Sequence, residues 1–190
     1  YRPGQKKLVS DVYRTIMRQK LLFMQAPTGV GKTISTIFPA VKAVGEELAD
    51  RIFYLTAKTI TATVAKETFA LLEKNGYRAK TIQITAKEKL CPCDEMECNP
   101  VTCPYAKGHF DRVNDAVFDL LHRCEMIERD DILSQADRYT VCPFELCLDT
   151  ASWCDNIICD YNYVFDPNVY LKRFFQEGIK GDYIFLIDEA

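Results

Sequence analysis

The sequence lacks the features that would place it in a membrane or in the secretory pathway. No run approaches the roughly 18 apolar residues of a membrane-spanning helix, and the amino terminus lacks the charged-then-apolar pattern of a signal peptide. Internal repeats and low-complexity tracts are absent as well. We therefore expect no membrane partner and a cytoplasmic location, or a nuclear one in a eukaryote. The first residue is Tyr and not Met, which is typical of an excised fragment, so a targeting segment could be missing.

The chain also has little net charge. Its 24 Lys and Arg against 27 Asp and Glu give a formal charge of −3. Bulk charge therefore gives no hint of nucleic acid, and a polyanion would have to bind in a local groove. The 190 residues, 48% apolar and 27% charged, are typical of a soluble globular protein with one sizeable core and space for a small insertion.

Cysteine is absent from the first 90 residues, and all nine cysteines lie between residues 91 and 159. Without a signal peptide, this crowding indicates metal binding or buried free thiols and not disulfides. The spacings C-x-C and C-x-x-x-x-C fit the paired knuckles of zinc sites poorly, whereas iron–sulfur clusters accept irregular spacing and neighbouring Cys-Pro pairs. Cys93 and Cys147 stay ambiguous as ligands. We interpret the thiols of Cys124, Cys154 and Cys159 as structural. We interpret His109 and His122 as ordinary surface or core histidines.

The first ninety residues alternate between helical and strand patterns. Apolar residues recur at helical spacing in three segments, and short apolar runs predict strands between them. A polar helical region covers about 107–137, and strand patterns return near the end. This alternation predicts an α/β fold with a mostly parallel sheet covered by helices. The expected helices are 5–18, 33–44 and 59–76, and the expected strands are 20–24, 51–55, 80–84, 156–160 and 183–187.

A glycine-rich turn, "APTGVGKT", lies between a predicted strand and a predicted helix. Glycines let successive backbone N–H groups point at phosphate oxygens, and the following helix adds the positive end of its dipole. Lys32 would reach the β and γ phosphates, and the Thr33 hydroxyl would join the Mg²⁺ shell. The predicted nucleotide contacts are Ala26, Pro27, Thr28, Gly29, Val30, Gly31, Lys32 and Thr33, with Ala26 where the pattern G-x-x-x-x-G-K-T has its first glycine.

Two adjacent carboxylates, Asp188 and Glu189, follow the last predicted strand. A phosphate loop needs an acid on a second strand for the metal and a base that orients water. Asp188 would therefore hold Mg²⁺ and Glu189 would polarise the attacking water. Taken alone, the segment fits an ordinary strand that ends in solvated acids, and the phosphate loop favours the catalytic interpretation.

The phosphate loop, the thiol-rich stretch and the Asp-Glu-Ala strand end follow one another in an order that resembles the XPD/DinG family of superfamily-two iron–sulfur DNA helicases. "QAPTGVGKT" resembles motif I, "YLTAKT" motif Ia, "ICDYNYVFDP" the segment after the cluster domain, and "LIDEA" a DEAH box. The resemblance implies a RecA-like P-loop domain, residues 1–89 and 151–190, with a small, mainly helical cluster domain inserted at 90–150. It also implies ATP-driven 5′-to-3′ translocation on single-stranded DNA with duplex separation, in DNA repair or replication.

The resemblance also implies cofactors and partners: ATP, Mg²⁺ and a 4Fe-4S cluster, single-stranded DNA, and the rest of the same helicase (a second RecA-like domain and an arch segment) in a monomer. Cys93 leaves the choice of cluster ligands open. Gln5 would contact adenine, Lys58 the DNA backbone, and two tyrosines the bases, although solvent-facing Gln and Lys and core-packed Tyr are the alternatives. The implied cluster ligands are Cys91, Cys98, Cys103 and Cys142. The implied base contacts are Tyr161 and Tyr163. Residues 1–190 alone are expected to hydrolyse ATP little, if at all, and not to unwind DNA.

Two other function classes stay open. One is a non-enzymatic nucleic-acid-binding or redox-sensing iron–sulfur module with a vestigial phosphate loop, which the intact Lys32, Thr33, Asp188 and Glu189 disfavour. The other is a P-loop kinase or GTPase with a zinc domain, which the missing base-recognition motifs disfavour.

Overall fold

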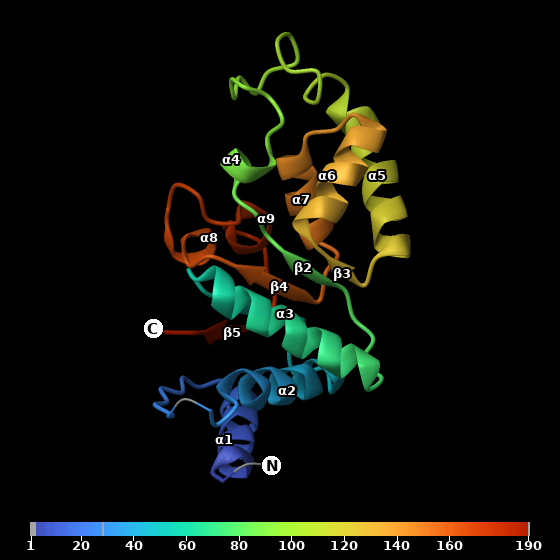
Figure 1. The fold of residues 1–190 in the computed structure, drawn as a ribbon. Coiled ribbons are helices and arrows are strands. Elements are labelled where there is room, and N and C mark those ends of the chain that lie inside the picture. Colours follow the sequence, from blue (N-terminus) through green and yellow to red (C-terminus); the bar gives the residue numbers. More distant parts are fainter. Residues whose placement is uncertain (1–2, 28, 190) are drawn as a thin grey trace. The chain divides into compact units, whose positions relative to one another are not determined.

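The computed structural model describes residues 3–27 and 29–189 (Figure 1). Its helices are α1 (Gln5–Met17), α2 (Lys32–Gly45), α3 (Thr59–Lys74), α4 (Lys87–Leu90), α5 (His109–Arg123), α6 (Arg129–Tyr139), α7 (Pro143–Ala151), α8 (Asn162–Phe165) and α9 (Lys172–Phe175). Its strands are β1 (Arg51–Leu55), β2 (Thr81–Gln83), β3 (Met126–Ile127), β4 (Asn156–Cys159) and β5 (Tyr183–Ile187), in the sheet order β3-β2-β4-β1-β5. The predicted α/β fold class is confirmed.

The chain divides into two compact units, one of Tyr1–Arg78 with Ile158–Ala190 and one of Ala79–Ile157. The second unit contains the whole of the predicted insertion at 90–150, whose boundaries stay a prediction. None of the described helices has both the length and the apolar character needed to span a lipid bilayer.

In the first unit, β1 and β5 pair in parallel, with Phe53 opposite Phe185 and Tyr54 opposite Leu186. Successive side chains of a strand point to opposite faces, so Phe53 and Tyr54 face different layers. Phe53 is fully buried, and its ring centroid lies 5.2–5.4 Å from the rings of Phe174, Phe175, Tyr183 and Phe185. This aromatic layer leaves the other face of β1 to the side chain of Tyr54.

Three longer helices complete this unit. The helix predicted for residues 33–44 is present as α2, in which Ile37, Ala40 and Ala43 are fully covered whereas Phe38 is exposed. Helix α3 ends at the C-cap Asn75, and Gly76 follows with a φ of 100°, a conformation that glycine adopts without steric cost. Gly76 therefore follows the end of the helix, and the observed end agrees with the predicted range of 59–76.

The strand predicted at residues 20–24 is wrong. Residues 20–27 carry no helix or strand, and Leu21 and Phe23 are 87% and 88% exposed. An apolar run becomes a strand only when its backbone groups find hydrogen-bond partners on a neighbouring strand. The length and hydrophobicity of this run therefore were not sufficient to predict a strand.

In the second unit, α5, α6 and α7 pack against one another, and β2 pairs with β3 in parallel. The structure separates the predicted helical region of 107–137 into α5 and α6, with β3 between them. A capping box of Glu128 and Asp131 begins α6. The amide of buried Gln135 donates to the Ala116 carbonyl at 2.8 Å and to the Asp119 carboxylate at 2.9 Å. These bonds join α6 to α5 and satisfy a polar side chain in the core.

Candidate functional site

The glycine-rich turn leads directly into α2, whose N-cap is Gly31. Gly29 and Gly31 have φ angles of 85° and 82°, which L side chains rarely adopt. Lys32 and Thr33 therefore lie in the first turn of α2, where backbone N–H groups have no partner within the helix. Lys32 is exposed and available to a ligand. Thr28, one of the predicted contacts, lies outside the described residues.

The two predicted magnesium ligands converge on one tyrosine that the sequence did not indicate. The Tyr54 hydroxyl donates to the Asp188 carboxylate at 3.2 Å and interacts with the Thr33 hydroxyl. Burial is the largest cause that raises the pKa of Tyr54, and the charge of Asp188 raises it further. Asp188 also continues the pairing of β5 with β1, because its N–H donates to the Leu55 carbonyl at 3.1 Å. The phosphate loop and the acidic strand end therefore meet at Tyr54.

The second acid, Glu189, forms an ion pair with Lys58, whose Nζ lies 2.5 Å from Glu189 Oε2. This hydrogen-bonded pairing raises the pKa of Lys58. Lys58 is the N-cap of α3, just beyond β1, and both side chains of the pair are exposed, so solvent screens it. Tyr161 donates to the backbone carbonyl of Asp188. Lys58 and Tyr161, predicted to contact DNA, thus lie beside the acidic strand end.

The predicted adenine contact, Gln5, lies at the phosphate loop. A Cβ added to Gly31 would approach Gln5 Nε2 to 2.9 Å. Gln5 also lines a cavity of about 230 Å³ together with Val9, Ile34, Ser35 and Phe38 of α1 and α2. An amide beside an apolar wall suits a flat heterocycle with polar edges.

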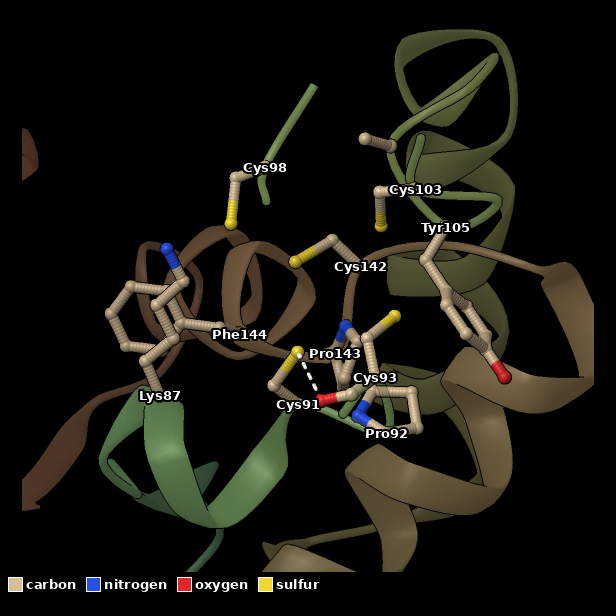
Figure 2. A pocket seen from close by; sticks show the side chains of 11 residues that line it. Lys87, Cys91, Pro92, Cys93, Cys98, Cys103, Tyr105, Cys142, Pro143 and Phe144 are labelled. Atoms are coloured by element: carbon tan, nitrogen blue, oxygen red, sulfur yellow. Dashed lines mark hydrogen bonds between the residues drawn. The ribbon is translucent and has the colours of Figure 1, made fainter. Parts of the chain in front are cut away.

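Five thiols of the second unit line one cavity of about 30 Å³, shown in Figure 2. They come from the segment after α4, from the turn before α5, and from the N-cap of α7. The five are Cys91, Cys93, Cys98, Cys103 and Cys142. The structure thus brings together the four thiols predicted as ligands, and it adds the ambiguous Cys93.

The charge at this cavity comes from Lys87, which the sequence did not single out. A hydrogen bond to the Cys98 side chain is the largest cause that raises the pKa of Lys87, followed by the charges of Cys98, Cys142 and Cys91. Burial raises the pKa of Cys142, and the backbone N–H groups at the start of α7 oppose that rise. Burial raises the pKa of Cys93 to about 11, helped by contact with Cys103.

The other cysteines lie apart from this cavity. Cys147 is fully buried, with its Sγ facing the Gln83 carbonyl at 4.0 Å, and burial raises its pKa to about 11. Cys154 and Cys159 are buried, as predicted for structural thiols. Within residues 3–27 and 29–189, no group of three or more His, Cys, Asp or Glu side chains is placed to hold a metal ion. The iron–sulfur assignment therefore stays a prediction.

Comparison with known proteins identifies the family. The sequence profile of the DEAD_2 family matches residues 60–190, more than half of the chain. The chain belongs to the DEAD_2 family. Two solved structures have the same fold as this DEAD_2 chain. One is described as "XPD_Helicase" and has 17% sequence identity and a TM-score of 0.65. The match covers 98% of this chain and 32% of the helicase chain. The other is described as "Truncated XPD" and has 16% sequence identity and a TM-score of 0.61. The match covers 100% of this chain and 52% of the other chain.

A search of curated proteins found no match. DEAD_2 membership confirms the predicted resemblance to the XPD/DinG helicases and supports a helicase-type fragment. The chain spans about a third and about half of the lengths of the two solved structures. The individual roles of Lys32, Asp188, Glu189 and the thiols stay predictions.

Proposed function

We propose that this DEAD_2 chain is the ATP-binding part of a DNA helicase motor. It couples ATP hydrolysis to 5′-to-3′ translocation on single-stranded DNA and to duplex separation, together with a second RecA-like domain and an arch segment. The observation that carries the proposal is the Tyr54 hydroxyl, which contacts both Thr33 and Asp188. A phosphate loop and a strand-end carboxylate within reach of one hydroxyl are two of the parts that nucleotide hydrolysis requires.

Each residue has a distinct role in this proposal. The amino terminus of α2 and Lys32 bind the phosphates, since backbone N–H groups and an ammonium both favour anions. Thr33 and Asp188 would hold Mg²⁺, which supplies charge neutralisation at the phosphates when bound. Glu189 orients the attacking water, and Gln5 contacts the base. The ion pair of Lys58 with Glu189 must open before Glu189 can act on water.

The thiol cavity supports a 4Fe-4S cluster through its donor set. Five thiols face one cavity, four are enough for a cubane, and the Lys87 ammonium offsets part of the thiolate charge. Cys91, Cys98, Cys103 and Cys142 would hold the cluster, while Cys93 lies beside them in the same cavity. Bound there, the cluster cross-links a loop that has little core of its own, as metal sites in small domains do.

ATP hydrolysis by the full-length protein, with and without single-stranded DNA, tests the motor. Lys32→Ala is expected to abolish hydrolysis while DNA binding persists, because only the phosphate contact is lost. Lys42→Ala is the matched control, since Lys42 lies in the last turn of the same helix and pairs with Glu46. Unwinding of duplexes with a 5′ tail and not a 3′ tail tests the direction. Unchanged unwinding by Lys32→Ala would refute the motor and favour a non-enzymatic DNA-binding module.

Iron and acid-labile sulfide, assayed in anaerobically purified protein, test the cluster. Cys142→Ser is expected to lower both. Cys147→Ser is the matched control and is expected to keep them, because Cys147 lies on the same helix but is buried away from the cavity. Stoichiometric zinc without sulfide would overturn the cluster and leave the motor untouched.

A further inference from the structure

His109 is buried, with 4% of its surface exposed, and it is the first residue of α5. Its Nδ1 accepts the backbone N–H of Cys142 at 3.2 Å. A nitrogen that accepts a hydrogen bond carries no proton, so Nε2 carries the proton in the neutral ring. Nε2 lies 3.9 Å from the Asp149 carboxylate of α7. The ring therefore spans from the N-cap of α7 to a residue nearly two turns along the same helix.

Arg112, one turn further along α5, binds the residues just before Cys142. Its Nε donates to the Tyr139 carbonyl at 2.8 Å, and its Nη2 donates to the Thr140 carbonyl at 2.6 Å. Nη2 also donates to the Lys107 carbonyl at 2.8 Å. The start of α5 thus fixes the α6–α7 turn that ends in Cys142.

The same helix start is tied to the turn that carries Cys103. The Cys103 carbonyl accepts the N–H groups of Ala106 and Lys107, each at 3.2 Å, and the Lys107 carbonyl is bound by Arg112. Protein hydrogen bonds alone therefore connect the Cys103 turn to the Cys142 turn. The remaining thiols, Cys91 and Cys98, come from residues 91–102, which form no helix or strand.

We propose that His109, assisted by Arg112, is a positioning residue that holds Cys142 opposite Cys103 before a cluster binds. This rests on the cluster proposed above. Cys103 and Cys142 then form the half of the site that His109 and Arg112 join, and Cys91 and Cys98 form the other half, on a segment without helix or strand. Partners that orient a metal ligand commonly change metal affinity 10–100-fold when they are removed.

His109→Leu in the full-length protein removes the Nδ1 acceptor and replaces the ring with an apolar side chain of similar size. We expect the cluster to be lost to an iron chelator about tenfold faster than in the wild type, with an altered visible circular dichroism spectrum of the cluster that remains. His109→Asn is expected to restore most of the wild-type rate, because the amide oxygen replaces Nδ1 as acceptor. His122→Leu is the matched control, since His122 lies near the exposed end of the same helix.

A second measurement does not need the loaded protein. In cluster-free protein, hydrogen exchange of residues 139–145 is expected to be slow in the wild type and in His109→Asn, and faster in His109→Leu. Equal cluster loss and equal exchange in His109→Leu and His122→Leu would overturn the proposal. So would an Asn variant that behaves like the Leu variant. Wild-type protein without sulfide would instead refute the cluster, and the positioning role with it.

Discussion

Replacing Tyr54 by Phe tests the meeting point of the phosphate loop and the acidic strand end. The ring stays, so the packing of this 2%-exposed side chain is kept, and only the hydroxyl that contacts Asp188 and Thr33 is lost. A hydrogen bond to a charged group contributes roughly 1.5–3 kcal/mol net. Asp188 is only half-buried and the bond is long at 3.2 Å, so we expect a loss of about 1.5 kcal/mol in the free energy of unfolding at pH 7.

Urea unfolding of the chain, followed by far-ultraviolet circular dichroism, measures this loss. Tyr13→Phe is the matched control, because the Tyr13 hydroxyl also donates to a carboxylate, that of Glu46, but at the surface. Surface substitutions of this kind change the stability by about 0.5 kcal/mol or less. A Tyr54→Phe variant no less stable than Tyr13→Phe would refute the reasoning.

The same variant has a pH signature. The pKa of Tyr54 is raised in the folded chain, mainly by burial, so the folded state favours the protonated phenol. This contribution to stability is complete below the ordinary tyrosine pKa of about 10 and is lost as the pH rises above it. Tyr54→Phe should therefore lose less stability than the wild type between pH 10 and 12. If the free energies of unfolding of the two proteins fell equally between pH 10 and 12, burial would not be raising the pKa of Tyr54.

Three further outcomes follow from contacts described above. Phe53→Ala is expected to cost about 3–5 kcal/mol in the free energy of unfolding, measured by urea, because it removes the central ring of a five-ring cluster; a cost under 1 kcal/mol would show that the layer repacks. Cys98→Ser should lower the iron and sulfide content while Cys93→Ser leaves it unchanged, and the reverse result would exchange their roles. Lys58→Ala should change stability by less than about 1 kcal/mol, since its pair with Glu189 is exposed, yet lower the salt dependence of single-stranded DNA binding by a slope of about 0.7; an unaltered slope in fluorescence anisotropy would remove Lys58 from the DNA contacts.

Much of the fold could be predicted from the sequence because helix and strand periods differ. The helix α2, the strand β1 and the end of α3 near Gly76 each follow from local patterns. The segment 20–24 shows the limit of that approach, because an apolar run does not specify a hydrogen-bond partner. The order of the strands in the sheet likewise depends on pairings that no single segment encodes.

The candidate site was predictable where its chemistry is local. The loop before Lys32 and the acids after β5 are contiguous motifs. Tyr54 escaped prediction because a tyrosine in an apolar strand is typical of a core, and only the parallel register places its hydroxyl beside Asp188. His109 escaped because Cys142 is distant in sequence, and no spacing rule connects a histidine to a backbone N–H.

The geometry at Gly31 has a consequence for anyone who wishes to change the nucleotide preference of this protein. A side chain at position 31 would be strained by its φ of 82° and would also require the flexible end of the Gln5 side chain to move aside. One residue thus restricts both the loop proposed to bind the phosphates and the side chain proposed to recognise the base. Libraries that vary the two parts separately would have to leave Gly31 fixed and diversify Gln5, Val9 and Phe38, which line the neighbouring cavity.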